Sequence, residues 1–180
     1  MATEQYATPD FVESCGLIPI DVRNRRVCLV YLKRKEEYVL AKGRRNILES
    51  RSSAAIREIF EETGLSCSLL PVRMETRAPP QVELAPTRDV VRVEESCVEP
   101  FMVTIREMKA GHVKIIWWFV GNIEAGQVEA LEEGRLKGGE EQFKAQMFGV
   151  DDAVRMLEFQ SDRGVLEKAL ELVRGTYWGE

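Results

Sequence analysis

One stretch of the sequence decides how the chain is organised: AKGRRNILESRSSAAIREIFEETGL, residues 41–65. Residues 50–63 of this stretch have helical spacing. Ser52 or Ser53 can serve as the N-cap, and Gly64 stands where a helix commonly ends in a left-handed residue. The stretch therefore predicts a glycine-containing loop that leads directly into a helix.

The predicted helix carries the glutamates Glu58, Glu61 and Glu62 on one side. The opposite side is expected to be apolar and consists of Ile56, Ile59, Phe60 and Thr63. Like charges three or four residues apart destabilise a helix by roughly 0.2–0.5 kcal/mol per pair, a cost that a bound divalent cation reverses. Oxygen ligands favour Mg²⁺ or Mn²⁺ over zinc. Taken alone, the same glutamates also fit an ordinary solvated face.

The rest of the chain alternates between strand-like and helix-like segments. Runs rich in β-branched and apolar residues predict strands at 11–20, 26–32, 37–41, 66–72, 101–106 and 112–123, with a further strand at Phe143. Residues 75–100 are polar and contain prolines, which predicts a long loop, and residues 124–141 are acidic and contain glycines. Helical spacing returns at 150–159 and 163–173. This order predicts an α/β fold with a mixed β-sheet sandwiched between α-helices.

Composition limits the kind of protein this chain can be. Its 180 residues are 44% apolar and 31% charged, as expected of one domain over residues 1–180 with a substantial core. A net charge of -5 disfavours nucleic acid and anionic lipid as partners. The longest apolar runs, such as 113–120 with Lys114 inside it, are shorter than the roughly 18–20 residues that cross a bilayer. We expect neither a nucleic-acid partner nor a membrane segment.

The cysteines and the start of the chain bear on its compartment. Cys15, Cys28, Cys67 and Cys97 stand far apart without a CxxC pair, so we expect reduced, packed thiols rather than zinc ligands. The first residues contain neither a cationic stretch nor an apolar segment. We therefore expect a cytoplasmic protein, although a signal peptide already removed would leave no trace in the sequence.

The decisive stretch follows a defined spacing: Gly43, five residues, Glu49, seven residues, Arg57-Glu58-Ile59, one residue, Glu61-Glu62, one residue, Gly64-Leu65. The spacing reproduces every defining position of the Nudix box, and the chain resembles the Nudix hydrolase family. From average residue usage, a chance match is on the order of one in a million. The resemblance extends more loosely to the neighbouring strands and the C-terminal helix, and it implies the same α/β fold.

The resemblance implies attack of water on a diphosphate, with a divalent metal neutralising charge on the phosphates. Glu58, Glu62 and the carbonyl of Lys42 are the implied Mg²⁺ ligands, and Mn²⁺ can substitute. Glu61 either completes the metal site or activates the attacking water, because the general base varies within the family. The implied catalytic set is Glu61, Glu58 and Arg57.

Several box residues have a chemical role that can be stated without the family resemblance. Gly43 stands where a loop must bring its backbone close to a metal or phosphate, which a Cβ would obstruct. The planar guanidinium of Arg57 can orient carboxylates, and Glu49 is its expected partner, pinning the loop to the helix. Glu49 and Gly64 therefore form the structural support of the predicted site.

Positive charges surround the box glycine despite the acidic total, which suits a polyphosphorylated small-molecule substrate. The candidate substrate-binding residues are Lys42, Gly43, Arg44, Arg45 and Lys33. The loop is similar to the Pro-Lys-Gly loop of Nudix enzymes that act on diadenosine polyphosphates and diphosphoinositol polyphosphates, with Ala41 in place of the proline. The Arg-Arg pair that follows Gly43 resembles the fungal diphosphoinositol polyphosphate branch.

Candidates outside the box are weaker. Glu140 or Glu141 could supply the further acidic ligand that this family often takes from a later loop, although either also fits a solvated loop. Trp117 and Trp118 must point to opposite faces of a strand, so one ring could stack on adenine if it is not packed in the core. His112 is the single histidine and fits a surface position or a phosphate contact.

These features predict Mg²⁺-dependent hydrolysis of the diphosphate group of inositol pyrophosphates, with release of orthophosphate. The nearest alternative is a hydrolase of diadenosine polyphosphates or of another nucleoside diphosphate derivative. A Nudix module that senses a ligand without turnover is a rival of another class, against which the intact box argues. Messenger-RNA decapping would require a basic RNA surface that an acidic chain scarcely offers. We favour a monomer and leave the oligomeric state open.

Overall fold

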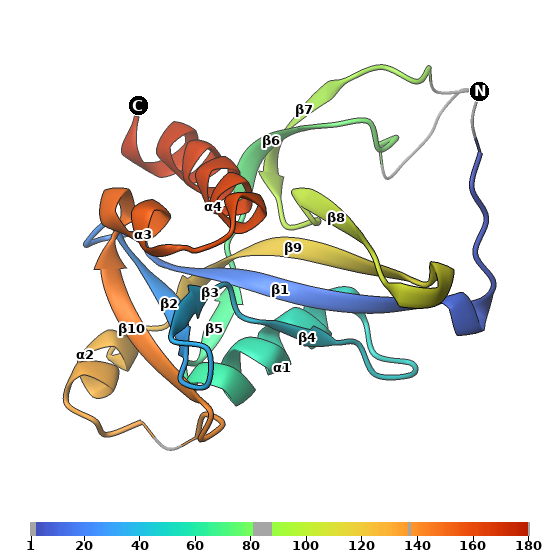
Figure 1. Cartoon of the computed structure of the whole chain (residues 1–180). Coiled ribbons are helices and arrows are strands. Elements are labelled where there is room, and N and C mark those ends of the chain that lie inside the picture. The colour runs from blue at the N-terminus through green and yellow to red at the C-terminus, as the bar shows by residue number, and fades with distance from the viewer. Residues whose placement is uncertain (1–2, 81–87, 137, 180) are drawn as a thin grey trace.

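The computed structural model describes residues 3–80, 88–136 and 138–179. Its centre is a pair of long parallel strands, β1 (Phe11–Asp21) and β9 (Val113–Ile123) (Figure 1). Every other pairing in this mixed sheet is antiparallel, and the main strand order is β10-β2-β1-β9-β5. Strand β2 (Arg26–Leu32) lies between β1 and β10 (Phe143–Gly149), and β9 pairs on its other edge with β5 (Cys67–Leu69) and β8 (Met102–Glu107).

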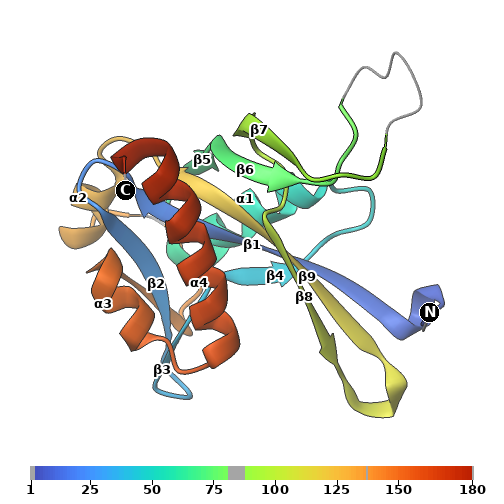
Figure 2. The ribbon, with the colours of Figure 1, turned by 90° about the horizontal axis from the view of Figure 1, so that it is seen from above.

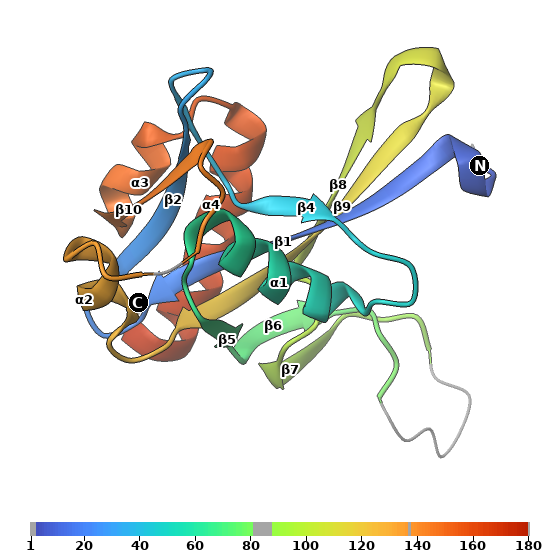
Figure 3. The same cartoon turned by 90° about the horizontal axis from the view of Figure 1, so that it is seen from below.

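Helices cover both faces of the sheet, which confirms the predicted α/β sandwich. On one face lie α3 (Val150–Met156) and α4 (Gln160–Val173), and on the other lie α1 (Arg51–Thr63) and α2 (Gln127–Glu132) (Figures 1 and 3). Each interface has its own apolar core. Alternate residues of one strand supply both cores: Ile18 of β1 packs on the α4 side, whereas Leu17 packs on the α1 side.

The expected long loop at 75–100 is wrong in part. Strands β6 (Val72–Thr76) and β7 (Arg92–Cys97) form an antiparallel two-stranded sheet, and residues 81–87 lie outside the described residues. Both strands are short and mostly exposed, and they contain many charged residues. The alternation of buried and exposed side chains, with Met74 among the buried ones, is therefore not evident in the sequence. The acidic segment 124–141 likewise contains a short helix, α2, that its composition did not indicate.

The expected strand over residues 37–41 ends at Val39, and a separate short strand that was not expected follows it. Strand β3 (Glu37–Val39) pairs with β2, whereas β4 (Lys42–Arg44) crosses over and pairs with β1. Near the start of β1, Ser14–Gly16 therefore pair with β4, and β2 pairs with β1 only at Ile20 and Asp21. This division separates β4 from β2 and creates the opening where the candidate site lies. In the described part of the chain, no helix is both long and apolar enough to cross a lipid bilayer.

Candidate active site

Helix α1 places the box glutamates, and its two ends are capped by side-chain and backbone hydrogen bonds. The N-cap is Ser50 rather than Ser52 or Ser53: its Oγ accepts a hydrogen bond of 3.0 Å from the backbone N–H of Ser53. Gly64 adopts the expected left-handed conformation, with φ of 76°, and its N–H donates to the carbonyl of Phe60 over 2.7 Å. The N-cap therefore lies two or three residues earlier than expected.

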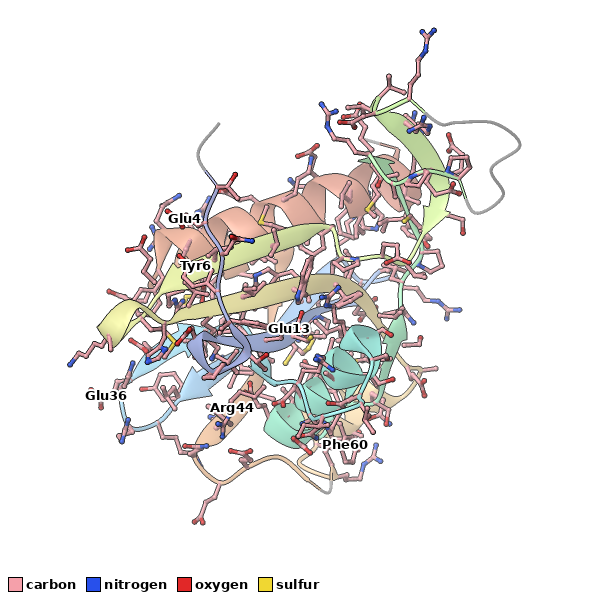
Figure 4. All side chains as sticks on the ribbon, turned by 90° about the vertical axis from the view of Figure 1, so that its right-hand side faces the viewer. Glu4, Tyr6, Glu13, Glu36, Arg44 and Phe60 are labelled. Carbon is pink, nitrogen blue, oxygen red and sulfur yellow. The ribbon has the colours of Figure 1, made fainter. Side chains whose placement is uncertain are left out.

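The expected division of α1 into an apolar side and an acidic side is wrong. Glu58 and Glu62 lie on the buried side with Ile59, each with only 9% of its surface exposed. Phe60 is instead 47% exposed and lies on the outer side of the helix (Figure 4). Alanines at 54 and 55 let the helix approach the sheet closely, and the two carboxylates then face β4. Burial of two carboxylates beside each other is costly unless a cation compensates.

Gly43 is the residue that makes room for one of these carboxylates. A Cβ built at Gly43 would lie 1.8 Å from Oε2 of Glu58, far inside van der Waals contact. The Glu58 carboxylate lies directly against the backbone of β4, so any larger residue at 43 would displace it. The expected approach of this backbone to a metal or phosphate stays a prediction.

Arg57 holds the loop and the helix together through the expected partner. Its Nε and Nη2 donate to the two carboxylate oxygens of Glu49 over 2.8 and 3.0 Å, a bidentate pair. Nη2 also donates to the carbonyl of Arg44 over 3.0 Å. The hydrogen bonds from Arg57 hold the pKa of Glu49 down at about 2. Glu49 thus stays ionised and keeps the loop at a fixed distance from α1.

The same guanidinium also orients two of the predicted catalytic carboxylates. Nη1 of Arg57 donates to Glu58 over 2.6 Å and to Glu61 over 2.8 Å. Glu61 is the most accessible of the three glutamates, with 44% of its side chain exposed. Within residues 3–80, 88–136 and 138–179, no three acidic, histidine or cysteine side chains converge on one metal position. Glu58 and Glu61 therefore share one nitrogen of Arg57, and Glu62 lies near enough to Glu58 for the charge of Glu58 to raise its pKa.

The electrostatics at Glu58 and Glu62 favour a bound cation. Burial raises the pKa of Glu62, and the nearby carboxylates of Glu58 and Glu140 raise it further, against the opposing charge and backbone N–H of Lys42. Burial also raises the pKa of Glu58 despite its bond to Arg57. Two crowded carboxylates that resist ionisation provide the oxygen-only environment that a hard divalent ion stabilises.

The structure distinguishes the two later-loop candidates. The N–H of Glu140 donates to the carbonyl of Glu61 over 2.8 Å, which places Glu140 at the C-terminal end of α1 where its charge reaches Glu58 and Glu62. The backbone carbonyl of Glu141 instead accepts a 2.6 Å bond from Nζ of Lys33. Lys33 is thereby held against the segment that follows Glu140, and its backbone N–H also donates to the carbonyl of Gln142 over 3.1 Å.

The two arginines after Gly43 point to opposite sides of β4. Register with β1 places Lys42 and Arg44 on one face, and Arg45 follows on the other. There Nε of Arg45 forms a 2.9 Å ion pair with Glu13, and Nη1 donates to the carbonyl of Glu49 over 2.8 Å. Glu13, the partner of Arg45, and Arg44 are both labelled in Figure 4. Arg45 is therefore engaged in holding the loop and is not brought together with Lys42 and Arg44.

A cavity of about 660 Å³ opens beside Glu62, between β4, the β2–β3 turn and the start of α4. The residues of its wall that bear on function are Arg34, Lys35, Lys42, Glu62, Arg106 and Phe159. Sequence reasoning missed Arg106 and Phe159. Lys114, which interrupts an apolar run of the sequence, is a further missed residue: its pKa is lowered by burial and by the charges of Lys42, Arg106 and Arg44.

The remaining aromatic and histidine candidates have protein partners. Trp118 is buried and donates to Thr104 over 3.0 Å, whereas Nε1 of Trp117 donates to Glu13 over 2.9 Å. The guanidinium of Arg51 covers the Trp117 ring at 4.0 Å from its centroid. His112 is exposed, 3.5 Å from Asp10. The four cysteines are free and buried.

No protein-family model and no curated protein matches the chain. Solved structures do match it. A Nudix-family hydrolase from Clostridium perfringens is 15% identical with a TM-score of 0.58, over 89% of this chain and 95% of that one. The C. elegans Ap4A hydrolase is 15% identical with a TM-score of 0.55, over 89% of this chain and 96% of that one. A Nudix hydrolase from Nitrosomonas europaea is 15% identical with a TM-score of 0.54, over 92% of this chain and 90% of that one. The fold is therefore that of Nudix hydrolases.

Proposed function

We propose that this protein is a Nudix hydrolase that cleaves the diphosphate group of inositol pyrophosphates in a Mg²⁺-dependent reaction, releasing orthophosphate. One observation carries the proposal: the Glu58 carboxylate lies on the backbone of Gly43, beside buried Glu62, in a position that only glycine leaves open. The box spacing and the fold support the same chemistry.

The residues present fit a hard divalent ion. Glu58, Glu62 and the carbonyl of Lys42 would hold Mg²⁺, or Mn²⁺ in its place, with Glu140 as the nearest further carboxylate. When bound, the ion supplies Lewis-acid stabilisation of charge on the phosphate oxygens. Gly43 leaves space for the carboxylate that would hold it, which is the feature that most directly indicates such a site.

The protein's own groups have separate tasks in this proposal. Arg57 holds Glu58 and Glu61 through one nitrogen and anchors itself on Glu49. Glu61, which is partly exposed, orients or deprotonates the attacking water. Lys42 and Arg44, on the opposite face of β4, bind phosphate oxygens of the substrate.

Turnover tests the proposal directly. The protein is incubated with Mg²⁺ and, separately, a diphosphoinositol polyphosphate, diadenosine polyphosphates, ADP-ribose and nucleoside triphosphates, and initial rates of product release are compared. We expect the diphosphoinositol polyphosphate to be cleaved fastest. Glu61→Gln and Glu62→Gln should each lower turnover at least about a hundredfold while remaining folded. Glu167→Gln, at an exposed position of α4, is the matched control. Unchanged turnover in both active-site variants would refute the assignment.

Hydrolysis of diadenosine polyphosphates is a second candidate with its own observation. Phe159 is 44% exposed and lines the cavity beside Glu62, where an aromatic ring can stack on adenine. One of the structural neighbours is the C. elegans Ap4A hydrolase. A higher rate on diadenosine polyphosphates, lost in Phe159→Ala, would replace the inositol substrate with the dinucleotide.

The cellular setting is also part of the proposal. We infer a cytoplasmic, monomeric enzyme acting on a small polyphosphorylated molecule. Sedimentation analysis of the purified protein tests the monomer, and a concentration-dependent dimer would contradict it. Ligand binding without any turnover would instead support the sensing module.

A further inference from the structure

Four cations from three strands lie on one face of the sheet. Lys42 and Arg44 of β4 pair in register with Gly16 and Ser14 of β1. Lys114 of β9 pairs with Val12 of β1 and with Arg106 of β8. Because register partners share a face, and alternate residues return to it, Lys42, Arg44, Arg106 and Lys114 all point the same way. We call these residues the cationic cluster.

In the part of the chain that the structure describes, the side chains of the cationic cluster form no ion pair with a carboxylate, although the carboxylates of Glu62 and Glu58 act at longer range on Lys42 and Lys114. Lys114 is half-buried, and burial together with the charges of Lys42, Arg106 and Arg44 lowers its pKa. The negative charge of Glu58 raises the pKa of Lys114, but by less than burial and the neighbouring cations lower it. Arg106 and Lys114 are direct cross-strand partners of like charge, an arrangement that destabilises a sheet.

A second, independent feature lies within the cluster. The hydroxyl oxygen of Ser14 is fully buried and has no hydrogen-bond partner among the described residues. Ser14 is the register partner of Arg44, so it shares the face of the cationic cluster. A buried hydroxyl without a partner is rare because it costs free energy, and this one lies on the same face of the sheet as the cationic cluster.

The cluster continues the cavity that begins at Glu62. Lys42 and Arg106 line that cavity together with Glu62, and Lys114 lies between them on the same face, because β9 stands between β1 and β8. Figure 2 shows the β8–β9 hairpin extending beyond α4, so this part of the sheet is not covered by the helix. A ligand whose one end lies at Glu62 would therefore rest its other end on the hairpin.

We propose that the cationic cluster binds the phosphorylated remainder of the substrate, away from the diphosphate being cleaved, and that Arg106 and Lys114 are the residues that select a substrate bearing several phosphates. The inference rests on the proposed function for the position of the cleaved bond. It adds a second contact region, on the β8–β9 hairpin, that neither the box nor the loop after Gly43 contains.

Binding without turnover is the first test. Inositol hexakisphosphate has no diphosphate group, and its affinity is measured by calorimetry on metal-free protein. We expect Arg106→Ala and Lys114→Ala each to weaken binding about tenfold, and the double variant more. Lys109→Ala removes an equal charge from the exposed tip of the same hairpin and should leave affinity within about twofold. Arg106→Lys and Lys114→Arg should restore most of the lost affinity.

Kinetics with Mg²⁺ and a diphosphoinositol polyphosphate is the second test. The two alanine variants should raise KM about tenfold with kcat nearly unchanged, and they should alter KM for a nucleoside triphosphate less. Thermal unfolding confirms that each variant is folded.

The outcomes separate the two proposals. Loss of hexakisphosphate binding in the variants, with no turnover by the wild type, supports the cationic cluster and overturns the proposed hydrolase. Three results would overturn the cationic cluster as a substrate site. The first is that neither alanine variant alters the kinetics, and the second is that Lys109→Ala loses as much affinity as they do. The third is that the wild type does not bind inositol hexakisphosphate.

Discussion

The two sides of β4 use positive charge in different ways. On the α1 side, Arg45 and Arg51 both bind Glu13, and Arg57 binds Glu49, Glu58 and Glu61. On the other side, the cationic cluster includes Lys42 and Arg44, whose side chains have no carboxylate partner among the described residues. Paired charges fix the geometry of the loop, whereas unpaired charges can bind an anion because no carboxylate has to be displaced.

The largest expected effect comes from filling the space on the α1 side. Gly43→Ala places a Cβ on the Glu58 carboxylate, so that carboxylate must move and turnover should fall at least about a hundredfold. Steady-state kinetics with Mg²⁺ measures the loss. Gly164→Ala is the control, because a Cβ there meets no atom within 4 Å and α4 should gain stability. Full activity in Gly43→Ala would mean that Glu58 does not act from this position.

Arg44 and Arg45 test the comparison directly, since they are neighbours on opposite faces. Arg45→Ala breaks the partly buried pair with Glu13 and should lower the free energy of unfolding by about 1–2 kcal/mol. Arg44→Ala should leave stability nearly unchanged and raise KM for the diphosphoinositol polyphosphate several-fold. Chemical denaturation and kinetics on both variants measure the two effects. Equal behaviour of the pair would contradict the division of roles.

The Glu62 carboxylate, which we propose holds the metal, should lower the stability of the metal-free protein. Because folding raises its pKa above the ordinary 4.5, ionisation of Glu62 destabilises the metal-free protein as the pH rises past that value. Glu62→Gln should therefore be more stable by about 1 kcal/mol at pH 8, with the difference vanishing below about pH 4. Mg²⁺ should raise the unfolding temperature of the wild type but not of the variant. A variant less stable than the wild type at pH 8 would overturn this interpretation.

The smallest effect concerns Glu49, whose pKa of about 2 lies below its usual value. A lowered pKa contributes stability above about pH 4.5 that is lost as the pH falls toward 2. Glu49→Gln should cost about 1 kcal/mol at pH 7, and the gap to the wild type should close near pH 2. Urea titrations across this range measure it, with Glu167→Gln as the control. If the difference in free energy of unfolding does not change with pH, the lost stability comes from packing alone and not from the charge of Glu49.

Local patterns predicted those elements whose signals lie in neighbouring residues. The strands β1, β2, β8 and β9 and the cap at Gly64 follow from alternation and from glycine, as does the Glu49–Arg57 pair from its chemistry. The strands β6 and β7 were missed because they are short and half-exposed. The burial of Glu58 was missed because the helical wheel assumes that carboxylates face water, whereas in this fold they face the backbone of β4.

The box, the helix that carries it and the layered α/β architecture are readable from the amino-acid sequence, because their signals lie in residues a few positions apart. Which cations share a face depends on how the strands pair in three dimensions. Lys42 is distant in sequence from Arg106 and Lys114, which belong to one hairpin, and strand register through β1 places the three on one face. Register depends on pairing between remote segments, so no local pattern could show that Arg45 would face Glu13 while Lys114 would join the residues around the cavity.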